Sequence, residues 1–142
     1  MKNYTSWLKA AGISQFIIAV IHAPTLFITS LPINESEKQL FTLMDTYQFD
    51  FGAGFHRTMS ELTFVFSACF CLLYIFGGLI NWHLLRKKTD TEIMKGVITI
   101  NLIVFGICFV IIAKFAFLLP VILSGLIFMF LILSRAAIPK SI

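Results

Sequence analysis

Four long apolar runs alternate with short polar segments along the chain. The runs cover residues 7–31, 57–85, 94–115 and 119–136. A helix rises ~1.5 Å per residue, so a run of about 20 apolar residues crosses the hydrocarbon core of a bilayer. The pattern therefore predicts an all-α polytopic membrane protein. We expect an antiparallel bundle of four transmembrane helices that forms one domain over residues 1–142.

Small and polar residues recur at spacings of three and four in the first two runs, which places them on one face of each helix. In the second run this face comprises Arg57, Ser60, Phe64, Ser67, Cys71, Tyr74, Gly78 and Asn81; in the first it comprises Leu8, Gly12, Gln15, Ala19, His22, Leu26 and Thr29. Small residues and interhelical hydrogen bonds drive helix association in membranes. The two faces are therefore expected to pack together. A helix-packing role is predicted for Gly12, Gln15, Ala19, Ser67, Gly77, Gly78, Asn81, Asn101 and Gly106. Pro24 is expected to kink the first helix just past His22.

The composition supports a membrane protein and argues against a nucleic-acid-binding protein. Hydrophobic residues make up 58% of the chain and charged residues 13%, whereas a soluble domain has about a quarter charged residues. The formal net charge is +4, but the Lys and Arg residues lie at the ends of the apolar runs and form no patch with interleaved aromatics. Their positions at the N-terminus, in the 86–95 segment and at the C-terminus predict that both termini are cytoplasmic. The expected location is the cytoplasmic (inner) membrane.

The segment from Pro32 to Gly54 is the one sizeable polar stretch, and it is acidic. The topology predicts that it forms an extracytoplasmic loop between the first two helices. Residues 38–44 are expected to form a short interfacial helix with Leu40, Phe41 and Met44 on its apolar side. Gly52-Ala53-Gly54 is expected to be a flexible joint before the second helix.

Ionisable residues gather toward the outer half of the predicted bundle. They suggest a ligand or proton site made of His22, His56, Arg57, Ser60, Glu61 and Lys114, because intramembrane ionisable residues often mark function. If His22 and Glu61 share this site, their mutational effects should be coupled. In the alternative interpretation Arg57 and Glu61 form a surface ion pair at i and i+4, His22 bonds a neighbouring helix, and Lys114 reaches the interface.

No cofactor or metal is predicted. Haem held by two histidines requires ligands at one depth, whereas His22 is deep and His56 and His83 lie at opposite edges. Cys69, Cys71 and Cys108 fit no zinc or redox spacing and are interpreted as small apolar residues. No nucleophile-elbow, phosphate-binding or dinucleotide motif is present. No catalytic residue is assigned, and enzymatic activity is left open.

The second run also carries a family resemblance. Gly54-Phe55, Ser60, Ser67 and the stretch Phe76-Gly77-Gly78-Leu79-Ile80-Asn81, together with His22 in the first run, resemble a family of small bacterial four-helix membrane proteins. The resemblance implies a four-helix bundle and no established activity.

Three functions are compatible with these features. The chain is expected to be an interaction protein, such as an accessory subunit of a membrane complex or an immunity-type protein. Alternatively, it handles a small molecule, a lipid or protons in an outer-leaflet polar cleft between the first two helices, using His22, Arg57 and Glu61. The third possibility is an intramembrane enzyme. The expected partners are the lipid bilayer and either another membrane protein or a second copy of the chain.

Overall fold

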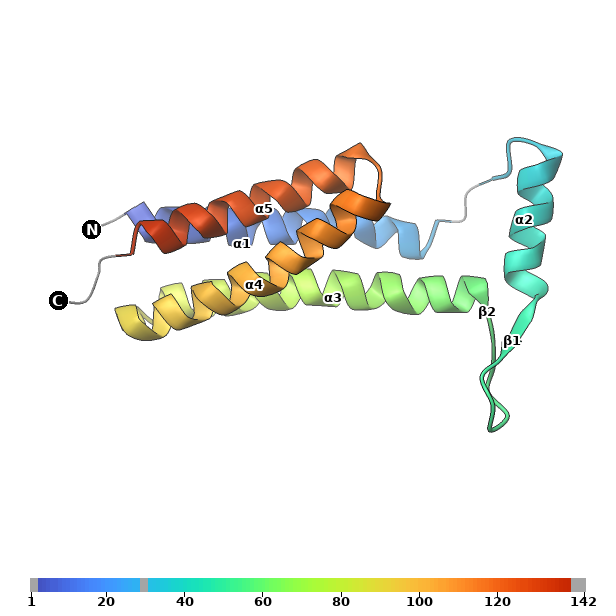
Figure 1. Cartoon of the computed structure of the whole chain (residues 1–142), viewed down its shortest axis with the longest axis horizontal. Helices are drawn as coiled ribbons and strands as arrows, with labels where there is room; N and C mark the ends of the chain where they lie inside the picture. Colours follow the sequence, from blue (N-terminus) through green and yellow to red (C-terminus); the bar gives the residue numbers. More distant parts are fainter. Residues whose placement is uncertain (1–2, 29–30, 139–142) are drawn as a thin grey trace. The chain divides into compact units, whose positions relative to one another are not determined.

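A computed structural model describes residues 3–28 and 31–138 of the chain (Figure 1). Its elements are α1 (Asn3–His22), the 3₁₀ helix η1 (Ala23–Leu26), α2 (Glu35–Thr46), β1 (Gln48–Asp50), β2 (His56–Thr58), α3 (Met59–Arg86), α4 (Thr91–Phe115) and α5 (Leu118–Ala136). Thr29 of the first predicted seam, and Lys2 and Lys140 of the positively charged termini, lie outside the described residues.

Within the described part of the chain, four helices are long and apolar enough to cross a membrane. They cover residues 4–26, 59–86, 91–115 and 118–136. These helices pack together, so the predicted four-helix polytopic membrane protein is confirmed. The sequence did not predict the short antiparallel hairpin of β1 and β2, in which Phe49 pairs with Arg57.

The start of α3 differs from the sequence prediction by two residues, and the reason is a capping box. The Glu61 backbone N–H donates to Thr58 Oγ1 at 3.2 Å, and the Thr58 N–H donates to Glu61 Oε2 at 2.9 Å. This reciprocal pair satisfies two backbone donors and begins the helix after Thr58. Arg57 therefore lies in β2 and not on a helical face, and Glu61 occupies the first turn of α3.

Pro24 changes the type of helix at the end of the first span. The α-helix ends at His22, and Pro24 lies in the first turn of η1. Proline has no N–H to continue the α-helical ladder, so the chain tightens here into a 3₁₀ turn. The Thr25 hydroxyl donates to the His22 carbonyl at 2.7 Å, which satisfies an oxygen beside the break.

The chain divides into two compact units, and the boundaries fall inside α1 and α3. The bundle unit comprises residues 1–19 and 73–142, and the hairpin unit comprises residues 20–72. The single domain expected from the sequence stays a prediction.

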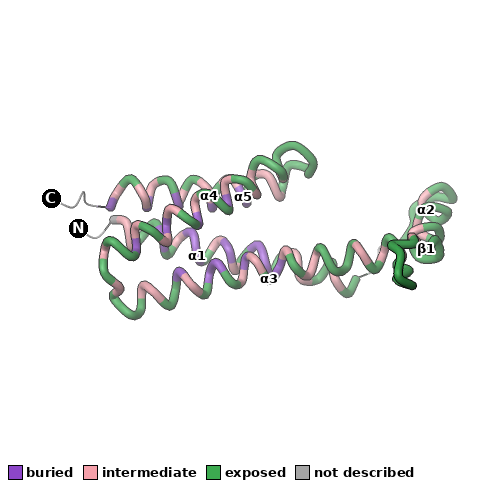
Figure 2. The backbone as a smooth tube through the Cα atoms, turned by 60° about the horizontal axis from the view of Figure 1, so that its bottom comes forward, coloured by how far each residue is buried: buried purple, intermediate pink, exposed green. Residues whose placement is uncertain are grey.

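The bundle unit contains segments of all four long helices, joined by ring contacts and hydrogen bonds. Tyr74 of α3 meets Phe105 of α4 edge-on, with ring centroids 5.2 Å apart. Trp7 of α1 stacks on Phe130 of α5 at 5.9 Å. The buried positions of α1, α3, α4 and α5 gather toward one another in this unit (Figure 2). Its apolar core includes Leu8, Ala11, Tyr74, Met94, Ile98, Phe105, Ile127 and Leu131.

The hairpin unit is held mainly by local hydrogen bonds. Asn34 caps α2, because its Oδ1 accepts from the Glu37 N–H at 2.9 Å, and Glu37 Oε2 accepts from the Ile33 N–H at 2.7 Å. The segment expected to be a flexible joint forms a turn, in which Gly52 and Gly54 both have φ of 80°. A side chain is strained at such φ values, so glycine suits both positions. The Ser60 hydroxyl donates to Asp45 Oδ1 and thereby ties α3 to α2.

Candidate functional site

The most buried polar contact in the bundle unit joins two of the predicted packing residues. Asn81 Nδ2 of α3 donates to Gln15 Oε1 of α1 at 3.1 Å, and both side chains are fully buried. Gln15 Nε2 and Asn81 Oδ1 have no hydrogen-bond partner among the described residues. An unpaired amide group is costly in an apolar interior. The single bond between the two side chains therefore matters for how α1 and α3 sit together.

Glycines allow the close approach around this amide pair. A methyl group on Gly77 would lie 2.7 Å from Gln15 Nε2 and 2.8 Å from Phe105 Cζ. One on Gly78 would lie 3.0 Å from the Phe16 ring and 3.3 Å from the Gly12 carbonyl oxygen. These distances are shorter than ordinary van der Waals contacts, so larger residues cannot replace either glycine without displacing a neighbour. The structure thus brings five predicted packing residues to one contact, namely Gly12, Gln15, Gly77, Gly78 and Asn81.

A reciprocal glycine–phenylalanine contact joins α4 to α5. A methyl group on Gly106 would lie 2.8 Å from the Phe128 ring, and one on Gly125 would lie 3.2 Å from the Phe109 ring. The two rings stack with centroids 5.7 Å apart. Gly106 was predicted as a packing residue from the sequence, whereas Phe109, Gly125 and Phe128 were not. Both helices carry a Gly-x-x-Phe motif, at residues 106–109 and 125–128, which is the signal that would have found them.

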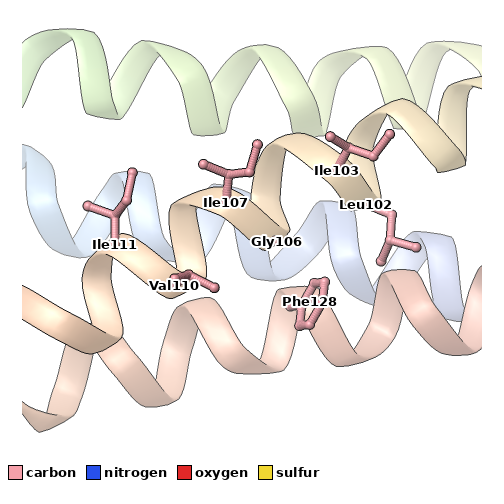
Figure 3. Close-up of a pocket in the computed structure, with 7 residues that line it drawn as sticks. All are labelled: Leu102, Ile103, Gly106, Ile107, Val110, Ile111 and Phe128. Atoms are coloured by element: carbon pink, nitrogen blue, oxygen red, sulfur yellow. The ribbon is translucent and has the colours of Figure 1, made fainter.

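An open groove of about 500 Å³ lies beside this contact (Figure 3). Its lining is Leu102, Ile103, Gly106, Ile107, Val110, Ile111 and Phe128, so it offers no polar side chain. A second groove of about 250 Å³ lies between α3 and α4, beside Gly77, Asn101 and Phe105. Asn101 Nδ2 donates to the Val97 carbonyl of its own helix at 3.0 Å. Such surfaces suit acyl chains or another helix, and they hold no group suited to catalysis.

The remaining predicted packing residues are Ala19 and Ser67. Ala19 is buried in the bundle unit. Ser67 is half-buried in the hairpin unit. Neither side chain carries a charge.

The contacts of the predicted outer-site residues are local. Glu61 serves the capping box with Thr58, and Arg57 Nη1 donates to the His56 carbonyl at 2.8 Å. Among the described residues the ion pairs are Lys38–Glu35 and Lys95–Glu92, so Arg57 and Glu61 form none. Arg57, Ser60 and Glu61 nevertheless line a common groove of about 630 Å³, together with Leu62, Phe64 and Val65.

His22 and Lys114 each make a ring contact of their own. The His22 ring meets the Phe70 ring edge-on, with centroids 4.9 Å apart. Phe70 follows Glu61 by nine residues of α3, which corresponds to ~13 Å along the helix. Lys114 belongs to the bundle unit, where its Nζ lies 5.2 Å from the Phe115 ring centroid. A site shared by all six residues stays a prediction.

The hairpin unit exposes an apolar stripe that the sequence located only in part. Leu40, Leu43 and Tyr47 are spaced by three and four along α2 and its C-cap, and they are 52%, 58% and 56% exposed. Phe41 and Met44, expected on the bilayer side, are instead half-buried. Phe51 and Phe55 flank the turn of the hairpin and are also exposed. This apolar stripe, residues 40, 43 and 47, is the strongest candidate for a binding surface in this unit.

The described residues contain no group of three or more His, Cys, Asp or Glu side chains that could hold a metal ion. Cys69 is exposed, Cys108 is half-buried and Cys71 is buried. No protein-family model, curated protein or solved structure matches the chain. The four-helix membrane architecture therefore rests on the sequence pattern and the structure.

Proposed function

We propose that this small polytopic membrane protein is an interaction protein, such as an accessory subunit, that binds a partner membrane protein through its hairpin unit. The observation that carries the proposal is the exposed apolar stripe of Leu40, Leu43 and Tyr47. Contiguous exposed apolar residues rimmed by polar ones mark interaction sites. Tyrosine is also one of the residues enriched at the energetic centres of interfaces.

The stripe is presented by a fixed helix. Asn34 caps the N-terminus of α2, and Asp45 accepts a hydrogen bond from Ser60 at the start of α3. A surface that is ordered before binding loses less conformational entropy when a partner docks. The rigid mounting of α2 thus favours recognition of one defined partner surface.

The charge of the hairpin unit favours a protein partner over a lipid surface. The unit carries five acidic residues, Glu35, Glu37, Asp45, Asp50 and Glu61, against two basic ones, Lys38 and Arg57. Helices that lie on membranes are usually rich in Lys and Arg on their polar face, because many lipid headgroups are anionic. An acidic rim around an apolar stripe suits a protein with apolar and basic residues.

The proposal includes a topology. Arg86, Lys87, Lys88 and Lys95 lie around the connection of α3 to α4, and the positive-inside rule then supports cytoplasmic termini in a bacterial inner membrane. The hairpin unit would face outward and meet an extracytoplasmic surface of the partner. Cysteines introduced at Glu37 and Lys140 in a cysteine-free chain test this with an impermeant thiol reagent. Labelling at 37 but not at 140 in intact cells is expected, and the reverse would overturn the topology.

The partner is tested by photo-crosslinking in native membranes. A benzoylphenylalanine placed at Leu43 should give one discrete, heavier band that contains a second protein, whereas the same group at the exposed Ser36 should not. Leu40→Glu in the same chain should abolish that band, because it places a charge in the stripe. A band that contains only this chain, a product with phospholipid only, or equal crosslinking from both positions would contradict the proposal.

One observation favours a second candidate, a site for a small amphipathic ligand. The groove at Arg57, Ser60 and Glu61 combines a cation, a hydroxyl and a carboxylate with the apolar Leu62, Phe64 and Val65. Such a lining suits a ligand with an anionic head and an apolar body. Photolabelling by a lipid-like probe that is lost in Arg57→Gln but kept in Arg86→Gln would support this candidate.

A further inference from the structure

A basic cluster lies at one end of the bundle unit. The start of α1, the end of α3, the start of α4 and the end of α5 all lie at this end (Figure 1). The described basic residues of these segments are Lys9, Arg86, Lys87, Lys88, Lys95 and Arg135, against the acidic Asp90 and Glu92. Basic clusters at the membrane boundary attract anionic lipids.

One member of this cluster is held in place by an interhelical contact. Arg135 Nε of α5 donates to Thr99 Oγ1 of α4 at 3.0 Å. The Thr99 hydroxyl in turn donates to the Lys95 carbonyl at 2.8 Å. This relay orients the guanidinium of a half-buried arginine between two helices, with no carboxylate paired to it among the described residues. The bond to Thr99 uses only one of its five donors.

α4 is open at Gly96, which precedes Thr99 by three residues. Lys95, Gly96 and Thr99 follow helical spacing on one side of α4. A methyl group on Gly96 would meet no heavy atom within 4 Å. The Lys95 ammonium lies 4.0 Å from the Glu92 carboxylate, which is itself 59% exposed. Lys95 is therefore only loosely paired and can contact a second anion.

The geometry points to a binding site for the phosphate headgroup of an anionic phospholipid between α4 and α5, made by Arg135 and Lys95 beside the open position of Gly96. A guanidinium that is fixed through Nε presents its remaining N–H groups as a planar fork, which matches a phosphate. The position near the end of α5 is where a headgroup lies when the acyl chains run along the exposed apolar helices. This fixed orientation sets Arg135 apart from the lysines of the same end.

A helix-dipole role for Arg135 would also place a cation in the last turn of α5. That role requires the charge but not the Thr99 hydroxyl. The lipid site requires both. Replacing Thr99 therefore separates the two explanations.

The test measures lipid binding to the purified full-length protein by native mass spectrometry, with phosphatidylglycerol and phosphatidylcholine titrated separately. The wild type should bind the first phosphatidylglycerol about five-fold more tightly than phosphatidylcholine, the preference that one basic contact supplies. Thr99→Val and Arg135→Gln should remove most of this preference. Thr99→Ser keeps the hydroxyl and should keep the preference, as should Lys87→Gln, which removes the same charge from an exposed position.

The outcomes that contradict the site are distinct. An unchanged preference in Thr99→Val would leave only a general attraction of the basic end. An equal loss of the phosphatidylglycerol preference in Lys87→Gln and Arg135→Gln would also indicate only a general attraction. If Thr99→Val does not fold, as judged by its circular dichroism melt, the comparison of Arg135→Gln with Lys87→Gln decides alone.

Discussion

The bundle unit and the hairpin unit differ in how far their polar side chains reach. In the bundle unit some bond within their own helix, as Asn101 does to the Val97 carbonyl, but three bonds join different helices: Asn81 to Gln15, Arg135 to Thr99, and the Ser134 hydroxyl to the Tyr4 carbonyl at 2.9 Å. In the hairpin unit nearly every such bond returns to backbone within four residues, as in the Asn34 cap and the Thr58–Glu61 capping box. The bond from Ser60 to Asp45 is the long-range one that the structure gives this unit.

The difference follows from what surrounds each polar group. Apolar surroundings provide no hydrogen-bonding solvent, so a buried polar side chain must find a partner in the protein, either on a carbonyl of its own helix or on another helix. Outside the apolar runs, water can hydrogen-bond the polar side chains. Those side chains are then available to cap the backbone N–H groups at helix ends and in turns. Polar residues therefore set helix contacts in the bundle unit. In the hairpin unit they cap the helix and form the turns, and Leu40, Leu43 and Tyr47 remain exposed.

The largest expected effect comes from breaking the helix contact directly. Gly78→Leu should push α1 from α3, because even a methyl group would lie 3.0 Å from the Phe16 ring. Overpacking of this kind destabilises by about 3 kcal/mol. Leu79→Phe, at an exposed neighbouring position, should change stability by less than about 1 kcal/mol. Melting temperatures of both variants in one detergent test the contrast, and equal values would contradict it.

The amide pair should give the next largest effect. Asn81→Leu leaves the Gln15 amide without its bond and should destabilise by about 2 kcal/mol. Gln15→Met should behave similarly. The double variant should be more stable than the sum predicts, with a coupling of about 1 kcal/mol, the scale of interhelical hydrogen bonds in membranes. Strictly additive losses would mean that the bond does not contribute.

Much of the bundle unit could be predicted because its signals are local. The length of an apolar run and the spacing of Gly12, Gln15, Gly78 and Asn81 are properties of single helices. The contact of Phe128 with Gly106 depends on how α4 and α5 align, and the contact of Arg135 with Thr99 joins residues 36 positions apart. Spacing within one helix cannot find either.

The hairpin unit was harder to predict for a different reason. Thr58-Met59-Ser60-Glu61 is a capping-box sequence, but the apolar run extends past it and suggested an earlier helix start. Phe41, Met44, Leu40 and Leu43 are all apolar, and their spacing does not tell which of them other residues of the unit cover. Burial within the unit decides that, and burial depends on the fold.

Loss of the Thr58 cap should change stability less than the Gly78 and Asn81 variants do, and the change should be confined to the start of α3. Thr58→Ala should cost about 1 kcal/mol and should raise hydrogen exchange in the first turn of α3. Thr63→Ala, at an exposed position further along α3, should leave exchange in that turn unchanged. Equal exchange in the two variants would argue against the capping box.

The smallest expected effect is the coupling between His22 and Glu61. His22 contacts Phe70, and Glu61 contacts Thr58. The effects of His22→Ala and Glu61→Gln on stability should therefore add to within about 0.5 kcal/mol. A coupling of about 1 kcal/mol or more would instead support the shared outer site that the sequence predicts.

The central claim is that α1 and α3 meet at the Gly12–Gln15 and Gly78–Asn81 positions. A Cβ atom at residue 12 would lie 3.8 Å from Asn81 Cβ, which is within the range that a disulfide requires. In a chain with Cys69, Cys71 and Cys108 replaced by alanine, Gly12→Cys and Asn81→Cys should form a disulfide under mild oxidation. The control pair, Gly12→Cys with Leu79→Cys, should stay reduced. Failure of the first pair to crosslink, or equal crosslinking of both pairs, would contradict the account.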